Sequence, residues 1–219
     1  MSRASIIAVC ISDKNQMWDL PEIPFYCHIE GYDAKFTPRD NNNMHRINYF
    51  NKRYGDAINT AIQKYPRCTD LLLIDTPFLQ NKAQINDLVS RYYQHTSVIL
   101  GASIWCWERT RIIKWIRYYD FLSVPELAPP LRWYKEKDLP VGLMRTTGVG
   151  KCWIFSRKIW ERTGRFLMPS PMQAGGSRCL DTTGYEVLLD CDTRLWIHLP
   201  APSLPRRILN SIPYLRRFY

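Results

Sequence analysis

The chain has 219 residues, a formal net charge of +10, 46% hydrophobic residues and 23% charged residues. This length fits one globular domain, and the composition excludes a chain that is disordered along most of its length. No apolar run approaches the roughly 18 residues of a membrane span, and the first residues show no secretory signal, so we expect a cytoplasmic protein.

The positive charge favours an anionic partner, which is a nucleic acid, a phosphorylated small molecule or an anionic membrane. Four arginines fall in residues 201–219, where there is no acidic residue. This segment is basic and amphipathic, although Pro213 prevents one regular helix through it. We expect a C-terminal tail or linker that docks on protein, with peripheral contact to a membrane as the alternative.

Seven cysteines are dispersed along the chain with no C-x-x-C pair. An odd, scattered set is typical of reduced thiols and not of a disulfide framework or a zinc site. Because free cysteine is common in cores, we expect most of these thiols to be buried.

Strand and helix patterns alternate in the first half of the chain. Apolar runs predict strands at residues 5–12, 25–30, 70–74 and 97–102. Apolar residues at three- and four-residue spacing predict helices within residues 47–62 and 82–93, the first of which ends before Pro66. This alternation predicts the α/β class with a mostly parallel central sheet.

The second half is less regular. A strand is expected at residues 149–155, a short helix at 157–163, and two late strands at 187–189 and 193–198. Prolines after residue 199 end the compact part, so residues 1–200 are interpreted as one domain.

Asp75 directly follows the apolar run at residues 70–74. The carboxyl ends of strands line the ligand crevice of an open α/β sheet, where a carboxylate can hold a divalent cation that bridges phosphates. An aspartate that caps a loop or the next helix is the structural alternative.

Two further residues are candidates for chemistry. Asp181 follows a glycine-bearing loop and can act as a base on a hydroxyl, or simply cap a turn. His198 ends the last expected strand and can complete a metal site with a carboxylate, or be an ordinary polar residue.

Several nucleotide and hydrolase signatures are absent. The chain has no G-x-x-x-x-G-K-[ST], G-x-G-x-x-G or G-x-S-x-G sequence. Residues 148–151 (GVGK) precede an expected strand, so their amides would not converge on a phosphate as those of a P-loop do.

Taken in order, four stretches resemble the GT-A-fold nucleotide-sugar glycosyltransferases, in particular the family-2-like members. Residues 55–62 (GDAINTAI) resemble the family's G-x-A-x-N-x-G-I helix, and residues 71–77 (LLLIDTP) its L-L-F-L-D-x-D strand. Residues 147–166 are similar to the segment beside the acceptor. Residues 184–198 are similar to the stretch that runs from G-Y to the metal-site histidine. The resemblance spans roughly residues 5–200.

The resemblance implies Mn²⁺ or Mg²⁺ as the cofactor. Pro77 stands where the second aspartate of the DxD motif is expected, so the metal would rest on Asp75 and His198. The family's acidic pair before G-Y is missing, and Asp181 is the nearest acid to serve as the base. The resemblance also places three residues near the nucleotide: Ser12, Glu30 and Asn59.

The implied activity is transfer of a sugar from a nucleoside-diphosphate sugar, with a UDP sugar expected, to a hydroxyl of a glycan or glycoprotein. A single base opposite the leaving group implies inversion at the anomeric carbon. Two alternatives stay open: a basic nucleic-acid-binding module, for which an RNP-type, KH or zinc-finger signature is missing, and a catalytically inactive nucleotide-sugar-binding relative.

Residues 105–119 mix basic and aromatic side chains. Aromatic faces stack on sugars and cations meet diphosphates, so a donor or acceptor groove is one interpretation. A half-buried helix with a solvated basic face is the other.

Overall fold

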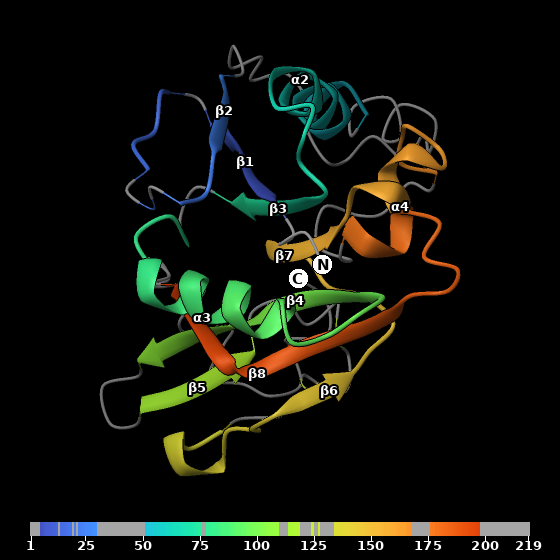
Figure 1. Cartoon of the computed structure of the whole chain (residues 1–219). Coiled ribbons are helices and arrows are strands. Elements are labelled where there is room, and N and C mark those ends of the chain that lie inside the picture. The colour runs from blue at the N-terminus through green and yellow to red at the C-terminus, as the bar shows by residue number, and fades with distance from the viewer. Residues whose placement is uncertain are drawn as a thin grey trace, which may run out of the picture.

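The computed structural model describes residues 5–12, 14–18, 20, 22–29, 51–75, 78–109, 114–118, 124, 127, 134–167 and 176–197. These residues form one eight-stranded sheet with helices on both faces (Figure 1). Among the helices of these ranges, none combines the length and the apolar character that crossing a membrane requires.

The elements follow one another along the chain as strands, helices and single turns. In chain order they are β1 (Ile6–Ser12), β2 (Phe25–Ile29), the π-helical turn η1 (Asn51–Gly55), α2 (Asp56–Lys64), β3 (Asp70–Asp75), α3 (Lys82–Tyr92), β4 (Val98–Arg109), β5 (Lys114–Tyr118), the 3-10 turn η4 (Glu136–Asp138), β6 (Leu143–Arg145), β7 (Cys152–Ser156), α4 (Arg157–Glu161), the 3-10 turn η5 (Gly176–Cys179) and β8 (Glu186–Ile197).

The sheet is mixed. In the described part of the chain its strand order is β2-β1-β3-β7-β4-β8-β6, and β5 pairs with the outer part of β4. Strands β1 to β4 and β8 point in one direction, whereas β5, β6 and β7 point in the other. The α/β class is therefore confirmed, and most of the described strands run parallel in direction, but β7 lies between β3 and β4 and is antiparallel to both.

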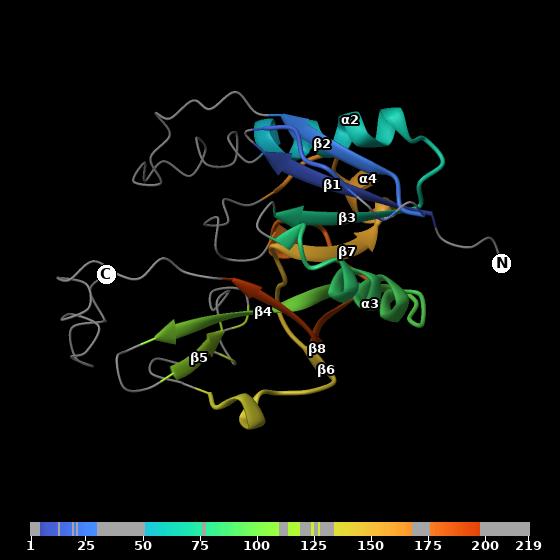
Figure 2. The same cartoon turned by 90° about the vertical axis from the view of Figure 1, so that its left-hand side faces the viewer.

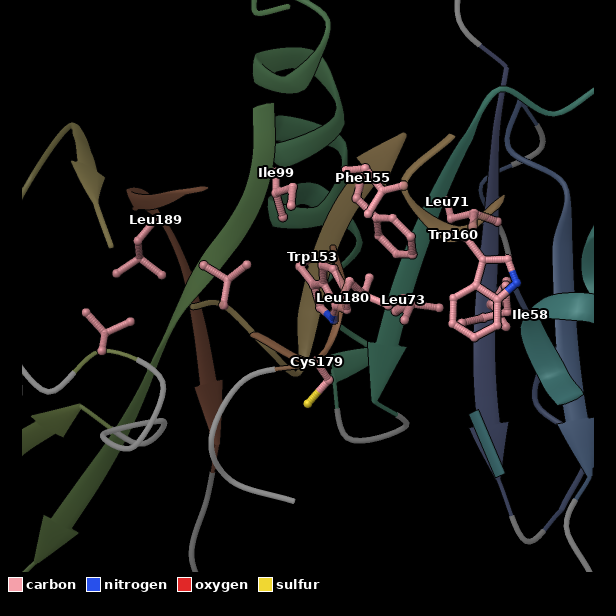
Figure 3. Packing of buried hydrophobic residues seen from close by; sticks show 14 of the residues in the cluster. Ile58, Leu71, Leu73, Ile99, Trp153, Phe155, Trp160, Cys179, Leu180 and Leu189 are labelled. Atoms are coloured by element: carbon pink, nitrogen blue, oxygen red, sulfur yellow. The ribbon is translucent and has the colours of Figure 1, made fainter. Parts of the chain in front are cut away.

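Strand alternation divides the core into two layers. Leu71 and Leu73 of β3 belong to a buried cluster with residues of α2 and α4, whereas Leu72 belongs to a cluster with residues of α3. Figure 3 shows the first layer, in which Trp160 of α4 lies beside Ile58 of α2. Helices α2 and α4 therefore cover one face of the sheet, and α3 covers the other.

Most predicted elements of the first half are confirmed. The strands at 5–12, 25–30 and 70–74 correspond to β1, β2 and β3, and the helix at 82–93 corresponds to α3. Helix α2 ends at Lys64, two residues before Pro66, as expected. Residues 47–50 of the longer helix expected there lie outside the described residues.

The helix considered for residues 105–119 is wrong. Strand β4 continues through this region to Arg109, and β5 pairs back on it. Ile104, Trp105 and Cys106 are consecutive and all buried, which requires cover on both faces, as in a central strand.

The two late strands predicted at 187–189 and 193–198 are one strand, β8, with a bulge. The pairing with β4 jumps from Asp190 to Arg194 between two neighbouring residues of β4, so residues 191–193 are extra. The buried carboxylate of Asp190 accepts hydrogen bonds from the backbone N–H of Asp192 and of Thr193. Hydrogen bonds within β8 itself therefore hold the bulge.

The cysteines follow the prediction that most of their thiols are buried. All seven are free thiols, and six of them are buried. Burial, with the charge of Asp190 adding to it, raises the pKa of the Cys191 thiol to about 11. Such thiols stay protonated at neutral pH and pack as small apolar side chains.

Candidate functional site

The candidate site lies where β1 and β3 end. Strand β1 lies between β2 and β3. The connection after β1 leads to β2 on one side, whereas the connection after β3 leads through α3 to β4 on the other side. Ligands of open α/β sheets bind at such a switch point, outside the carboxyl ends of the strands. Ile11 pairs with Asp75, which brings Ser12 and Asp75 to neighbouring strand ends. We call this end of the sheet the carboxyl edge.

Lys151 contacts Asp75 through both its backbone and its side chain. Its backbone N–H donates to the carbonyl of Lys151 at 2.7 Å, and the Lys151 Nζ lies 3.0 Å from its Oδ2. The side chains are 26% and 19% exposed, so both charges are largely withdrawn from water. Asp75 follows Leu71 and Leu73 at two-residue spacing, which places it on the sheet face of α2 and α4.

The loop that carries Lys151 is anchored by packing and hydrogen bonds. The Val149 N–H donates to the Ser177 hydroxyl at 2.8 Å, and its carbonyl accepts from the Ser177 N–H at 3.2 Å. A Cβ at Gly101 of β4 would lie 2.5 Å from the Cβ of Val149, so this close approach requires glycine. As predicted, the loop leads into a strand, β7, and not into a helix.

Lys151 itself has a left-handed backbone, with φ of 66°. For a residue other than glycine this conformation costs roughly 1–2 kcal/mol. Such strain persists only where the surroundings enforce it, and it is frequent at functional sites. Here the anchored loop and the contacts with Asp75 enforce it.

Ser12 organises the loop after β1. Its side chain is buried, and its hydroxyl accepts hydrogen bonds from the Lys14 N–H at 3.3 Å and from the Gln16 Nε2 at 2.9 Å. Lys14 is exposed on this loop. Ser12 thus lies at the carboxyl edge, as predicted, and one of its roles there is to shape a loop that presents a cation.

Asn59 has a structural partner. It lies on α2, and its Oδ1 accepts a hydrogen bond from the Trp160 Nε1 of α4 at 2.8 Å. This bond ties together the two helices that cover the same face of the sheet. The nucleotide contact predicted for Asn59 remains a prediction.

Asp181 belongs to a different neighbourhood from Asp75. Its Oδ1 accepts from the Thr183 N–H at 3.0 Å and lies 3.8 Å from the Arg162 guanidinium. Hydrogen bonds from Thr183, assisted by the charge of Arg162, hold the pKa of the Asp181 carboxyl below its usual range. Its partners lie on the path from α4 to the beginning of β8, whereas Asp75 ends β3.

The structure therefore brings together Ser12 and Asp75 of the predicted site residues, whereas the contacts of Asn59 and Asp181 described above are with other residues. Glu30 and His198 lie outside the described residues, as does the tail at 201–219.

Sequence reasoning missed Lys151. It lies 76 positions after Asp75 in the chain, and its only signal was a glycine-rich loop that does not form a P-loop. The contact exists because β7 pairs with β3 and begins at Cys152, directly after Lys151.

Sequence reasoning also missed an aromatic pair on the strands that extend furthest. Trp107 of β4 and Trp196 of β8 are half-buried and stacked, with ring centroids 5.2 Å apart and planes at 15°. Through β7, Leu73 is level with Gly101, so Trp107 lies four residues, about 13 Å, beyond the level of Asp75. Figure 2 shows β4 and β5 extending past the end of β3.

The described donors do not fit a divalent cation. No group of three histidine, cysteine or acidic side chains that could hold a metal occurs in the described ranges. At Asp75 the neighbouring charge is an ammonium, and the nearby Cys152 thiol has its pKa raised by burial and by the charge of Asp75. The metal site predicted for Asp75 with His198 thus lacks support from the described residues.

A hollow of about 1030 Å³ lies at the opposite end of β3, which we call the amino edge. There the buried Asp70 accepts hydrogen bonds from the Tyr92 hydroxyl at 2.7 Å and the Thr69 hydroxyl at 2.6 Å. Arg157 donates to the Pro66 carbonyl and pairs with Glu161. These groups join β3 to α3 and α4, so the polar lining of this hollow holds the fold.

The chain matches no protein-family model, and no curated protein is significantly similar to it in sequence. The geometry of the carboxyl edge therefore carries the functional inference.

Proposed function

We propose that this chain is a GT-A-type glycosyltransferase that takes a nucleoside-diphosphate sugar, with a UDP sugar expected, at the carboxyl edge of β1 and β3. The observation that carries the proposal is the Asp75–Lys151 pair at the switch point of the sheet. A carboxylate and an ammonium group are held there, partly shielded from water, where an open α/β sheet binds its ligand.

The overhanging strands support a sugar-binding role for the same side of the molecule. Trp107 and Trp196 lie on the α2 and α4 face, as Asp75 does, and they extend beyond it. Aromatic rings present flat apolar faces on which sugar rings pack. A glycan or glycoprotein acceptor would therefore approach along β4 and β8.

In the proposed reaction the acceptor oxygen bonds to the anomeric carbon as the bond from that carbon to the diphosphate breaks. The electron pair of the broken bond stays on the diphosphate, and the hydroxyl proton passes to a carboxylate. The sequence predicts Asp181 as this base. Asp181 precedes the start of β8, which pairs with the start of β4, so its role as base stays a prediction separate from the Asp75–Lys151 pair. One base opposite the leaving group gives inversion.

The test is release of nucleoside diphosphate from a panel of UDP and GDP sugars in the presence of mixed glycans. We expect turnover of one donor by the wild type, and loss of that turnover in Asp75→Asn. Asp87→Asn is the control, because it makes the same change on the exposed face of α3.

Equal turnover in Asp75→Asn would remove the carboxyl edge as the site. Donor binding without turnover would indicate the inactive relative. Absence of any response, together with oligonucleotide binding that weakens steeply with salt, would favour the nucleic-acid module.

A further inference from the structure

The geometry points to Lys151 as the resident cation of this site: its ammonium binds the diphosphate of the donor in the place where a divalent metal would otherwise act. This inference rests on the proposed function and adds to it the way in which the leaving group is held. It predicts that nucleoside diphosphates bind with no divalent metal present.

Lys151 lies at the position where a metal ion would be needed. A metal-dependent site would use the Asp75 carboxylate to hold a cation against the phosphates. In this chain the Lys151 Nζ lies 3.0 Å from the Asp75 Oδ2, at the end of β3. The carboxylate therefore already has a cation beside it, supplied by the chain itself.

The Lys151 ammonium can hydrogen-bond to more than one acceptor at once. One of its partners is the Asp75 carboxylate at 3.0 Å. A diphosphate carries several acceptor oxygens, so it can share the same ammonium with Asp75. The carboxylate then orients the cation.

Two lysine charges lie at or near the carboxyl edge. Lys14 is exposed on the loop that the buried Ser12 hydroxyl holds at the neighbouring strand end. The exposed Lys14 ammonium adds a second cation on this side of the sheet, and a cation attracts an anion. A divalent cation at Asp75 would instead lie close to the Lys151 ammonium, and the two like charges would repel.

The backbone of Lys151 is strained. Lys151 keeps a left-handed φ of 66° although glycine would adopt it without strain. The adjoining loop is fixed by the Val149–Ser177 hydrogen bonds and by Gly101. The fold therefore holds a lysine at this position against its own backbone preference.

The experiment measures binding of UDP and of GDP by titration calorimetry, once with EDTA and once with Mn²⁺. The test variant is Lys151→Met, which removes the charge and keeps a long side chain. The control is Lys158→Met, which makes the same change at an exposed position of α4. If Lys151→Met does not fold, Lys151→Met combined with Asp75→Asn removes both charges of the pair.

We expect one nucleoside diphosphate to bind the wild type and Lys158→Met in EDTA, with no gain from Mn²⁺. Lys151→Met, or the double variant, should bind at least ten-fold more weakly. Binding that requires Mn²⁺ would overturn the inference and leave the proposed function standing, as would EDTA binding that Lys151→Met does not change. No binding of either nucleotide under both conditions would overturn the proposed function itself.

Discussion

Strand β3 begins with Asp70 and ends with Asp75, and the structure surrounds these two aspartates differently. Asp70 is 6% exposed, and its oxygens accept hydrogen bonds from the hydroxyls of Tyr92 and Thr69. Asp75 is 26% exposed in its side chain and lies beside the Lys151 ammonium.

The difference separates a structural carboxylate from a functional one. Neutral hydroxyls from α3 and from the preceding residue satisfy Asp70, so its charge stabilises the joint between β3 and α3. Asp75 instead pairs with a cation, at the edge where ligands of this sheet class bind. Position along one strand therefore decides between the two roles.

The largest expected effect is at Asp70. Asp70→Asn replaces a buried carboxylate that accepts from two hydroxyls with an amide that turns an N–H₂ group toward one of them. Hydrogen bonds to a charged group are worth about 1.5–3 kcal/mol, so we expect a loss of about 2–3 kcal/mol in the free energy of unfolding. Urea denaturation measures it, with the exposed Asp87→Asn as a control that stays within about 0.5 kcal/mol.

Packing at the carboxyl edge gives the next effect. Gly101→Ala places a Cβ 2.5 Å from the Cβ of Val149, in the loop that carries Lys151. Overpacking of this kind costs about 1–3 kcal/mol. At Gly55 a new Cβ would be 3.4 Å or more from its neighbours, so Gly55→Ala should not destabilise the fold. Equal midpoints for the two variants in thermal unfolding would contradict the close approach of Val149.

A smaller, pH-dependent effect tests the network at Asp70. Removing the hydroxyl in Tyr92→Phe should cost about 1–2 kcal/mol at pH 7. Burial, the Asp70 charge and their hydrogen bond raise the pKa of Tyr92. Folding then favours the protonated phenol, and the stability it contributes is present below the unfolded pKa of about 10 and lost as pH rises above it.

The deficit of Tyr92→Phe relative to the wild type should therefore shrink above pH 10. Guanidinium unfolding of both proteins between pH 7 and pH 11 measures this difference, in which the contributions of the buried thiols common to both proteins cancel. A deficit that stays constant or grows with pH would mean that the Tyr92 hydroxyl does not donate to Asp70.

The smallest effect on stability is expected at Asp75. Partly exposed ion pairs contribute up to about 1 kcal/mol, so Asp75→Asn should lower the free energy of unfolding by no more than that. A loss as large as that of Asp70→Asn, measured by the same urea titration, would remove the distinction between the two ends of β3.

How far the sequence predicted the fold depends on how local each signal is. The consecutive apolar residues of β1 and β3 and the helical spacing of α3 were sufficient, because these patterns lie within one element. The apolar run at residues 104–107 was ambiguous, since a short apolar run fits either a central strand or a buried helix. Cover from both layers of the core decides for a strand there.

In the candidate site, too, features that lie within one element were predictable and contacts between distant segments were not. The position of Asp75 after an apolar strand predicted a side chain at the carboxyl edge, and the structure places it there beside Ser12. That position did not predict the contact of Asp75 with Lys151 or the stacking of Trp196 on Trp107. Each of these depends on pairing between strands that are far apart in the chain.

The sequence by itself determined the alternation of strands and helices, the α/β class, and the aspartate at the end of β3, since hydrophobic periodicity and burial of short segments are properties of each segment alone. The tertiary structure decided which cation meets that aspartate. Insertion of β7 between β3 and β4 brings Lys151 to Asp75, and backbone hydrogen bonds between segments about 80 residues apart fix that contact.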